Sequence, residues 1–489
     1  MEIFAREKEK KELERIFYSK QSEFVAVYGR RRVGKTYLVR HTFKPKECIY
    51  FELVGQKQEN GDTAPVDHQL ANCHYAFEKA FGVSVEKPDS WDTAFRMLKK
   101  KVDTYINSGK TIVIFIDELP WLCTPNSQFY ENLDQAWNAC FEPAGNIKVI
   151  VCGSASTWML KRIIYAKAGL SRRVTLKLHL RPFTLRETQA FLQWKNCHYS
   201  PDTVAEAFMV FGGIPYYLNF LMHNKSLYQN IEEQCFSRDG HLANEYDIIF
   251  DSLFKNSSAY KRVMEVLSQS RKGKTHNELH TAAKVSTGRL HTILHNLYEC
   301  DFIDKRVIVH NRQRGTLYFL HDEFTLFYVK WIQSASTSLG IRESFIQSIS
   351  RKQAYKVWLG FSFEMMCMKH HEQIKHALGL AKIAASPGIF YAYDDVSKKR
   401  TTQIDLLFDR ADKTITICEI KYQDSPYELQ KKDFDSMKRK KQALENYLRS
   451  KRLPQKSIVF AWITPMGLKK NAYYYEMYPE EVVLSDLFV

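Results

Sequence analysis

Three short, mostly apolar runs stand out in the first third of the chain. They cover residues 23–28, 111–116 and 147–152, and each is followed by small or acidic residues. Continuous apolar runs of this length are typical of strands buried on both faces, as in a parallel sheet covered by helices. The pattern therefore predicts an α/β domain in this part of the chain.

In the middle of the chain the apolar spacing becomes helical. Amphipathic segments such as 201–211 and 215–222 predict a group of helices that forms a lid. From about residue 258 the chain predicts three further helices and then an alternating segment, 304–320, that forms a hairpin. Three helices followed by a hairpin are the order of a winged helix-turn-helix.

The third of these helices has a clear apolar face. Leu290, Ile293, Leu294 and Leu297 follow the i, i+3, i+4, i+7 spacing and are expected to face the core. The outward positions are then Arg289, His291, Thr292 and His295. If this module binds DNA, that outward face enters the major groove and Arg312 and Arg314 in the wing contact phosphates. The alternative is a rigid packing module between domains.

The last third predicts a helix over 360–378, with Phe363, Met366, Cys367 and the region of His370 on one face. Two strands follow, at 402–410 and 414–422. Side chains alternate across a strand, so Glu419 and Lys421 share a face with two apolar isoleucines. A partly buried salt bridge adds little net stability, so another reason for this pair of charges is needed.

Composition narrows the class of protein. The 489 residues predict about three domains, and 71 Lys+Arg against 55 Asp+Glu give a net charge of +16. This excess favours a polyanionic partner such as nucleic acid, the alternative being a merely soluble basic protein. Ten cysteines without a C-x-x-C pair are typical of reduced thiols. With no apolar leader or membrane-length run, we expect a cytoplasmic protein.

A phosphate-binding loop follows the first predicted strand. Its pattern, G-x-x-x-x-G-K-T, lets backbone N–H groups surround the phosphates of ATP, while the lysine reaches the β- and γ-phosphates and the threonine binds Mg²⁺. The candidate nucleotide-binding residues are Gly29, Arg30, Arg31, Arg32, Val33, Gly34, Lys35 and Thr36.

The second apolar run ends in two carboxylates. Asp117 and Glu118 occupy the expected Walker B position, where the first holds Mg²⁺ through water and the second orients and deprotonates the attacking water. The third run ends near Ser154 and Ser156. Either serine can sense the γ-phosphate or, alternatively, cap the next helix.

Taken in order, the segments FAREKEKKEL, YGRRRVGKT, FIDELPWL and VCGSAS resemble the archaeal-type AAA ATPase family. The resemblance continues through residues 169–188 and 211–218. It implies that Arg173, beside Arg172, acts on nucleotide in the same or in a neighbouring subunit. It also implies that the turn containing Gly213 and Pro215 packs on the adenine side of the nucleotide.

The C-terminal strands resemble the PD-(D/E)xK nuclease superfamily, and the ATPase family often ends in such a domain. Asp405, Glu419 and the carbonyl of Ile420 supply hard oxygen ligands for Mg²⁺, with Glu364 completing the set, and Lys421 positions or deprotonates water. Ile404, not proline, precedes Asp405, which departs from the motif that names the superfamily.

A strongly basic helix follows the charged strand. It presents either a solvated face or a phosphate-contacting surface, with Lys440 or Lys441 pointing into the candidate metal site. Its basic residues are Lys431, Lys432, Lys438, Arg439, Lys440, Lys441, Arg449, Lys451 and Arg452.

These patterns predict four domains: an AAA-type ATPase core (1–180), a helical lid (181–255), a winged helix-turn-helix (256–338) and an α/β nuclease-like domain (339–489). The function we expect is ATP hydrolysis that regulates a Mg²⁺-dependent nuclease acting on nucleic acid, with DNA as the first choice. The alternatives are a nucleotide-switched scaffold whose last domain only binds nucleic acid or protein, and a signalling ATPase that assembles into homo-oligomers.

Overall fold

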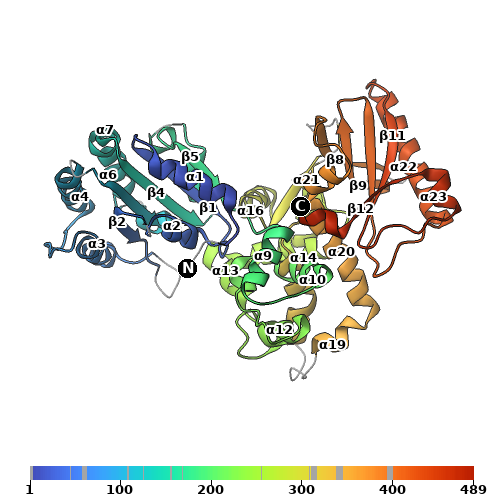
Figure 1. Cartoon of the computed structure of the whole chain (residues 1–489), viewed down its shortest axis with the longest axis horizontal. Coiled ribbons are helices and arrows are strands. Elements are labelled where there is room, and N and C mark those ends of the chain that lie inside the picture. The colour runs from blue at the N-terminus through green and yellow to red at the C-terminus, as the bar shows by residue number, and fades with distance from the viewer. Residues whose placement is uncertain are drawn as a thin grey trace. The chain divides into compact units, whose positions relative to one another are not determined.

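The computed structural model describes most of the chain. The residues outside the description are 1–3, 45, 58–62, 107–108, 125, 155–156, 168, 255, 308, 310–315, 337–344 and 394–399. The chain divides into two compact units, whose elements are labelled in Figure 1. Unit 1 contains Met1–Pro182, Asp251–Lys255 and Glu299–Asp301, and unit 2 contains Phe183–Phe250, Asn256–Tyr298 and Phe302–Val489.

Unit 1 is built on a five-stranded parallel sheet. In spatial order its strands are β2 (Cys48–Val54), β3 (Thr111–Asp117), β4 (Ile147–Ser154), β1 (Glu23–Gly29) and β5 (Leu176–His179). The strands β3 and β4 are buried along almost their whole length, which confirms the expectation from the apolar runs. Because the strands are parallel, Gly29, Asp117 and Ser154 end at the same edge of the sheet.

Helices supply the rest of the core of unit 1. They include α1 (Glu7–Tyr18), α2 (Lys35–Phe43), α3 (Val66–Phe81), α4 (Trp91–Tyr105) and α6 (Phe129–Ala136). The helix α4 shows why such segments fold: the Ser90 side chain accepts a hydrogen bond from the N–H of Thr93 and caps the first turn. Its buried residues recur at helical spacing. Burial of each large apolar side chain among them stabilises the unit by about 1.5–3 kcal/mol. The buried residues are Trp91, Ala94, Phe95, Leu98 and Val102.

The first half of unit 2 is helical. It contains α9 (Leu185–Trp194), α10 (Pro201–Phe211), α11 (Pro215–Leu218), α12 (Leu227–Ile231) and most of α13 (Glu245–Leu253). Three helices follow, and then an antiparallel strand pair. These elements are α14 (Ser257–Ser268), α15 (His276–Ala283), α16 (Thr287–Glu299), β6 (Ile303–Arg306) and β7 (Leu317–Leu320).

The apolar face predicted for the third helix is confirmed. All four aliphatic residues, Leu290, Ile293, Leu294 and Leu297, are buried in α16. On the opposite side Arg289, His291 and Thr292 are exposed and His295 is half-buried. Arg312 and Arg314 lie outside the described residues.

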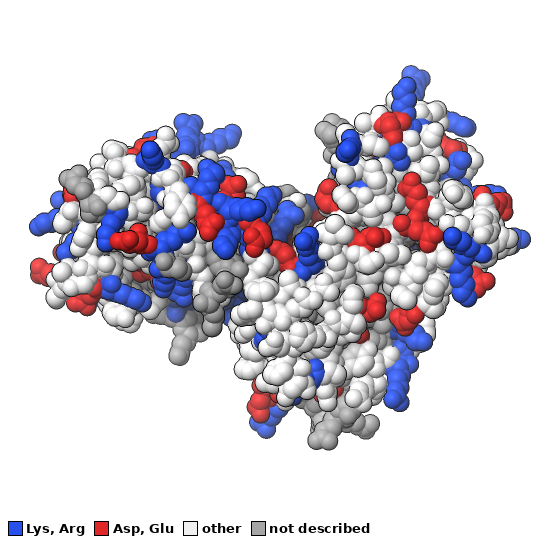
Figure 2. All heavy atoms as spheres, viewed as in Figure 1, with Lys and Arg blue, Asp and Glu red and all other residues white. Residues whose placement is uncertain are grey.

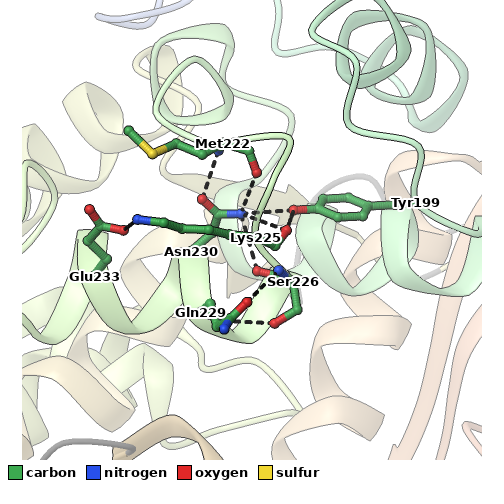
Figure 3. Close-up of polar contacts among 7 residues, drawn as sticks. All are labelled: Tyr199, Met222, Lys225, Ser226, Gln229, Asn230 and Glu233. Carbon is green, nitrogen blue, oxygen red and sulfur yellow. Dashed lines mark hydrogen bonds and ion pairs between the residues drawn. The ribbon is translucent and has the colours of Figure 1, made fainter.

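One buried amide organises the segment between α11 and α12 (Figure 3). The Asn230 Oδ1 accepts a hydrogen bond from the N–H of Met222 at 2.8 Å, and its Nδ2 lies 2.9 Å from the Tyr199 hydroxyl and 3.0 Å from the Met222 carbonyl. Further carbonyls, of Lys225 and Ser226, lie within 3.3 Å of the same nitrogen. Since Asn offers a donor and an acceptor on one short side chain, it satisfies backbone groups that would otherwise be buried without partners.

The second half of unit 2 contains a mixed five-stranded sheet. In spatial order its strands are β12 (Glu480–Val483), β11 (Ser457–Thr464), β10 (Thr414–Ile420), β9 (Arg400–Arg410) and β8 (Ala385–Tyr393). The strands β8, β9 and β10 are antiparallel neighbours, whereas β10, β11 and β12 are parallel. A long helix, α22 (Lys431–Ser450), joins β10 to β11 and lies beside the sheet (Figure 1).

The prediction of a single helix over 360–378 is wrong in one respect, because two helices occupy this segment. They are α20 (Gln353–Lys369) and α21 (His371–Ala377), and His370 between them leaves the helical conformation. Its Nδ1 bonds the Met366 carbonyl at 2.8 Å, and its Nε2 accepts a hydrogen bond from the N–H of Leu185 at 3.0 Å. The ring therefore satisfies the first turn of α9, a contact that no local pattern encodes.

Burial lowers the pKa of His370 to about 4, so the ring is neutral in the folded protein at neutral pH. The unfolded chain takes up the proton at an ordinary pKa near 6.5, so the stability that depends on a neutral ring is present above that value and falls as the pH drops toward 4. Between pH 7 and pH 5 we expect a loss of roughly 2 kcal/mol in the free energy of unfolding from this group.

Urea unfolding of wild type and His370→Gln at both pH values measures this loss, since glutamine keeps an acceptor and does not titrate. The pH-dependent loss is expected to be smaller in His370→Gln by that amount, whereas His223→Gln, at an exposed position, follows wild type. Identical pH dependence in wild type and His370→Gln contradicts the prediction.

Candidate functional sites

The loop after β1 has the backbone that phosphate binding requires. Gly29 has φ +148°, and a Cβ added there would lie 2.2 Å from the carbonyl oxygen of Leu180, so no other residue fits. Gly34 has φ +90° and directly precedes α2. The Lys35 ammonium folds back over the loop and donates to the carbonyls of Gly29 at 3.2 Å and Arg30 at 2.9 Å.

The predicted Mg²⁺ ligands of unit 1 lie together. The Thr36 hydroxyl, in the first turn of α2, donates a hydrogen bond of 2.7 Å to Asp117 Oδ2 at the end of β3. Asp117 is buried. A hydroxyl and a carboxylate are hard oxygen donors, and Lys35 supplies the positive charge for the phosphates, so the residues present fit a Mg²⁺–nucleotide complex.

Glu118 turns away from its strand to face β4. Its backbone has φ +50°, a left-handed conformation that a residue with a Cβ adopts at a cost of about 1 kcal/mol or more. Its Oε1 accepts a hydrogen bond from the Ser154 hydroxyl at 3.4 Å. The structure thus brings together Lys35, Thr36, Asp117, Glu118 and Ser154, while Ser156 lies outside the described residues.

Arg6 also contacts this loop, a role that its position in the sequence does not predict. Its guanidinium is buried and donates to the carbonyl of Val33 at 3.3 Å. The only sequence signal for Arg6 is the resemblance of the segment FAREKEKKEL to the ATPase family. Nothing in the spacing of this segment relates residue 6 to a loop 27 residues later.

Two other predicted groups have contacts of their own. The Arg173 side chain is 43% exposed and pairs with Glu142 at 3.5 Å, while the neighbouring Arg172 donates to the Lys167 carbonyl. Gly213 and Pro215 belong to unit 2. There a Cβ at Gly213 would lie 2.3 Å from the carbonyl oxygen of Phe183, so packing within unit 2 already requires this glycine.

In unit 2 the Glu419 carboxylate is held between two lysines. The Lys421 Nζ lies 2.8 Å from Oε1, and the Lys440 Nζ lies 2.5 Å from Oε2. Burial opposes the charge on Glu419, but the Lys440 and Lys421 ammoniums outweigh it and hold the pKa of this carboxyl below its ordinary value. Of the two lysines left open by the sequence, the structure therefore selects Lys440, and Lys441 lies near Glu445.

Glu364 lies in the same electrostatic environment as Asp405 and Glu419. Burial, the charge of Asp405 and, to a smaller extent, that of Glu419 raise the pKa of the Glu364 carboxyl above its ordinary value, against the opposing effect of Arg271 and Arg306. The two arginines come from the segments after α14 and in β6, and the sequence contains no signal that relates them to α20. Asp405 itself accepts a hydrogen bond from the Gln403 amide.

A cavity of about 270 Å³ opens beside this site. Its lining is mostly charged and consists of Glu419, Lys421, Lys432, Asp433, Ser436, Arg439 and Trp462. Within the described part of the chain, no three His, Cys, Asp or Glu side chains are grouped so that they could hold a metal ion. The donors Glu364, Asp405 and Glu419 suit Mg²⁺ chemically, but both Glu419 oxygens are paired with ammonium groups in this arrangement.

Residues 3–221 match the family model of an ATPase domain found predominantly in Archaea. This part of the chain is therefore similar to archaeal-type ATPase domains. The uncharacterised protein MJECL04 of Methanocaldococcus jannaschii is 25% identical over 364 residues, which are 73% of this chain and 75% of that protein.

Solved structures match at lower identity. A Walker-type ATPase, paby2304 of Pyrococcus abyssi, has a TM-score of 0.49 and 18% identity over 67% of this chain and 96% of its own. The ORC2 protein of Aeropyrum pernix, in ADPNP–ADP complexes, has a TM-score of 0.43 and 14% identity over 69% and 96%. Across the helices described in both units, none is long and apolar enough to span a membrane.

The Glu419 pairing predicts a pH-dependent loss of stability on removing Lys440. In Lys440→Met the carboxylate stays buried with one partner fewer, so we expect a loss of about 1–3 kcal/mol at pH 7. A carboxyl whose folded pKa is depressed stabilises the fold above its unfolded pKa and loses that contribution as pH falls through the folded value. The difference from wild type should therefore shrink below about pH 4.

Thermal or urea unfolding between pH 3.5 and pH 7 checks this. Lys438→Met is the matched control on the same helix, because its ion pair with Glu476 is long, at 3.9 Å, and exposed. Equal losses of stability in the two variants would show that Lys440 contributes no more to the stability of the fold than a surface lysine does.

Proposed function

We propose that the chain is an ATP-hydrolysing AAA-type ATPase of the cytoplasm. Its nucleotide state controls a Mg²⁺-dependent nuclease-like site in unit 2, and that site acts on nucleic acid, with DNA as the first choice. The observation that carries the ATPase part is the 2.7 Å hydrogen bond between Thr36 and Asp117, with Lys35 folded over the same loop. Four proposed domains, 1–180, 181–255, 256–338 and 339–489, divide these tasks.

Each residue of the unit 1 site then has a defined task. Residues 29–36 wrap the phosphates with backbone N–H groups, and Lys35 binds the β- and γ-phosphates. Thr36 and Asp117 hold Mg²⁺, which neutralises charge on the phosphates when bound. Glu118 orients the attacking water and accepts its proton, and Ser154, which donates to the Glu118 carboxylate, keeps that carboxylate in place.

Arg173 is proposed to act on nucleotide in a neighbouring subunit. The Arg173 side chain is 43% exposed, and its ion pair within the described residues is with an exposed glutamate, so it is available to a second copy at little cost. This proposal implies homo-oligomers that form in the presence of ATP.

Buried polar contacts support coupling between the lid and the nuclease-like site within unit 2. Glu206 on α10 accepts hydrogen bonds from Tyr228 at 2.9 Å and from Tyr355 on α20 at 2.8 Å. The same helix α20 carries Glu364 about two and a half turns after Tyr355. A movement of α10 in the lid is therefore transmitted through Glu206, Tyr355 and α20 to the carboxylates of the proposed metal site.

A second function is favoured by one specific observation. Both oxygens of Glu419 are bonded to lysines, and the described residues contain no three-ligand metal group. This arrangement favours a nucleotide-switched scaffold whose last domain binds nucleic acid or a protein without cutting. Melting temperatures with Mg²⁺ or Mn²⁺ distinguish the two, because a metal site gives a rise that Asp405→Ala removes.

For ATP hydrolysis, Lys35→Ala is expected to lose ATP binding, because the phosphate charges lose their buried counter-charge. Glu118→Gln is expected to bind ATP and to lower kcat by about 10²–10⁴-fold, because the base is lost. Phosphate release and binding of a fluorescent ATP analogue measure both, with Lys110→Ala as an exposed control. Full activity in the Lys35 and Glu118 variants would disprove the assignment.

For the nuclease-like site, Asp405→Ala and Lys421→Ala are expected to abolish Mg²⁺-dependent cleavage. Asp412→Ala, an aspartate in the turn after the same strand, is expected to leave it unchanged. Supercoiled plasmid and labelled DNA and RNA oligonucleotides are incubated with ATP, ADP or no nucleotide. If wild type cuts none of these substrates under any condition, the scaffold function is preferred.

A further inference from the structure

Two tyrosines project from the short helix α23 (Ala472–Met477) and the residue after it. The Tyr475 side chain is 62% exposed and Tyr478 is 80% exposed. The N–H of Tyr478 donates to the Tyr474 carbonyl at 2.7 Å. Tyr478 itself has φ +47°, so the backbone leaves the helical conformation at this residue. Tyr474 lies between them, with ring centroids 5.5 Å from Tyr475 and 6.4 Å from Tyr478.

The base under these rings is well anchored. Tyr473 packs against Phe434 of α22 with ring centroids 5.8 Å apart, and Tyr473, Tyr474 and Met477 border the core of the C-terminal sheet. Asn471 caps the helix, accepting from the N–H of Tyr474 at 3.0 Å and donating to the Leu429 carbonyl at 2.7 Å. The backbone that carries the exposed rings is thus held in place before any ligand binds, which lowers the entropy cost of binding.

One lysine of α22 contacts the helix that carries the tyrosines. The Lys438 Nζ lies 3.9 Å from the centre of the Phe434 ring, and its ion pair with Glu476 of α23 is exposed. Lys431 and Arg439 are also exposed on α22. Figure 2 shows the region of α23 as white surface bordered by blue and red side chains. Lysines are depleted at protein–protein interfaces, whereas lysine beside exposed aromatic rings is the combination that suits nucleic acid.

The helix α22 connects these tyrosines to the charged cavity. Lys432, Ser436 and Arg439 line the cavity on one flank of the helix. Phe434 and Lys438 are about half a turn away on the other flank, at 100° per residue. The two flanks are separated by roughly one helix diameter, about 10–12 Å. On the exposed arc between them Lys431 lies next to Lys438, Arg439 lies next to the cavity, and Asp435 lies between the two.

We infer that Tyr475 and Tyr478 stack on the bases of a single-stranded nucleic acid whose phosphates follow Lys431, Lys438 and Arg439 toward the cavity beside Glu419. The bases of a duplex are stacked on each other, so exposed rings on a surface favour unpaired bases. This inference rests on the proposed function in that unit 2 acts on nucleic acid, and it adds the strand form of the substrate.

The test measures binding of a fluorescein-labelled 20-mer, single-stranded or annealed to its complement, by anisotropy with full-length protein in EDTA. EDTA prevents cleavage, so binding is read independently of the metal site. We expect wild type to prefer the single strand, and each of Tyr475→Ala and Tyr478→Ala to weaken single-strand binding roughly tenfold. Tyr475→Phe and Tyr478→Phe keep the ring and should bind as wild type does. Tyr75→Ala, an exposed tyrosine in unit 1, is the matched control.

The outcomes separate the inference from the proposed function. Wild type that binds both forms, with no loss in the alanine variants, overturns the inference and leaves a nucleic-acid function in place. Wild-type protein that binds neither the single strand nor the duplex overturns both the inference and the proposed nucleic-acid function. If the alanine variants bind nucleic acid normally but sediment as smaller species than wild type, the tyrosines form a contact between copies of the chain and the inference is again wrong.

Discussion

One buried carboxylate fixes the arrangement of helices in unit 2. Glu323, at the start of α17 (Glu323–Phe327), is fully buried, and the Lys369 Nζ at the end of α20 lies 2.5 Å from its Oε2. Gly212, which ends α10, leaves room for the same oxygen, because a Cβ there would lie 2.7 Å away. Removing one partner of a buried pair costs about 3–5 kcal/mol, since the other charge stays unpaired. The pair therefore links α17 to α20, and Gly212 lets the end of α10 approach the same carboxylate.

The same constraint shapes both candidate sites. In unit 1 Lys35 satisfies its ammonium with the carbonyls of Gly29 and Arg30. In unit 2 Glu419 is compensated by two lysines, and Glu364 lies in the field of two arginines. Lys35 and Glu419 are kept largely out of water and already have polar partners. In the proposed function a phosphate or a cation therefore replaces an existing partner, so that no bare charge is exposed. This property links the stability of the fold to its chemistry.

Much of the fold and of the unit 1 site follows from local pattern. The apolar runs locate β1, β3 and β4, and the residues directly after them must meet because parallel strands end at one edge. The buried face of α16 follows from three leucines and one isoleucine at helical spacing. In contrast, the break at His370, the contact of Arg6 with Val33 and the position of Arg271 and Arg306 near Glu364 were not predictable. Each depends on segments far apart in the chain, and no periodicity relates them.

The sequence by itself determined which short segments form strands and helices, where phosphate can bind, and which residue types are available for chemistry, because steric and hydrophobic preferences act over a few residues. Tertiary structure alone decided that Lys440 rather than Lys441 pairs with Glu419, that Gly212 and Gly213 are required by Glu323 and Phe183, and that Tyr473 of α23 packs against Phe434 of α22. These outcomes depend on how buried charges and rings are satisfied across the whole fold, which is a property of packing rather than of local pattern.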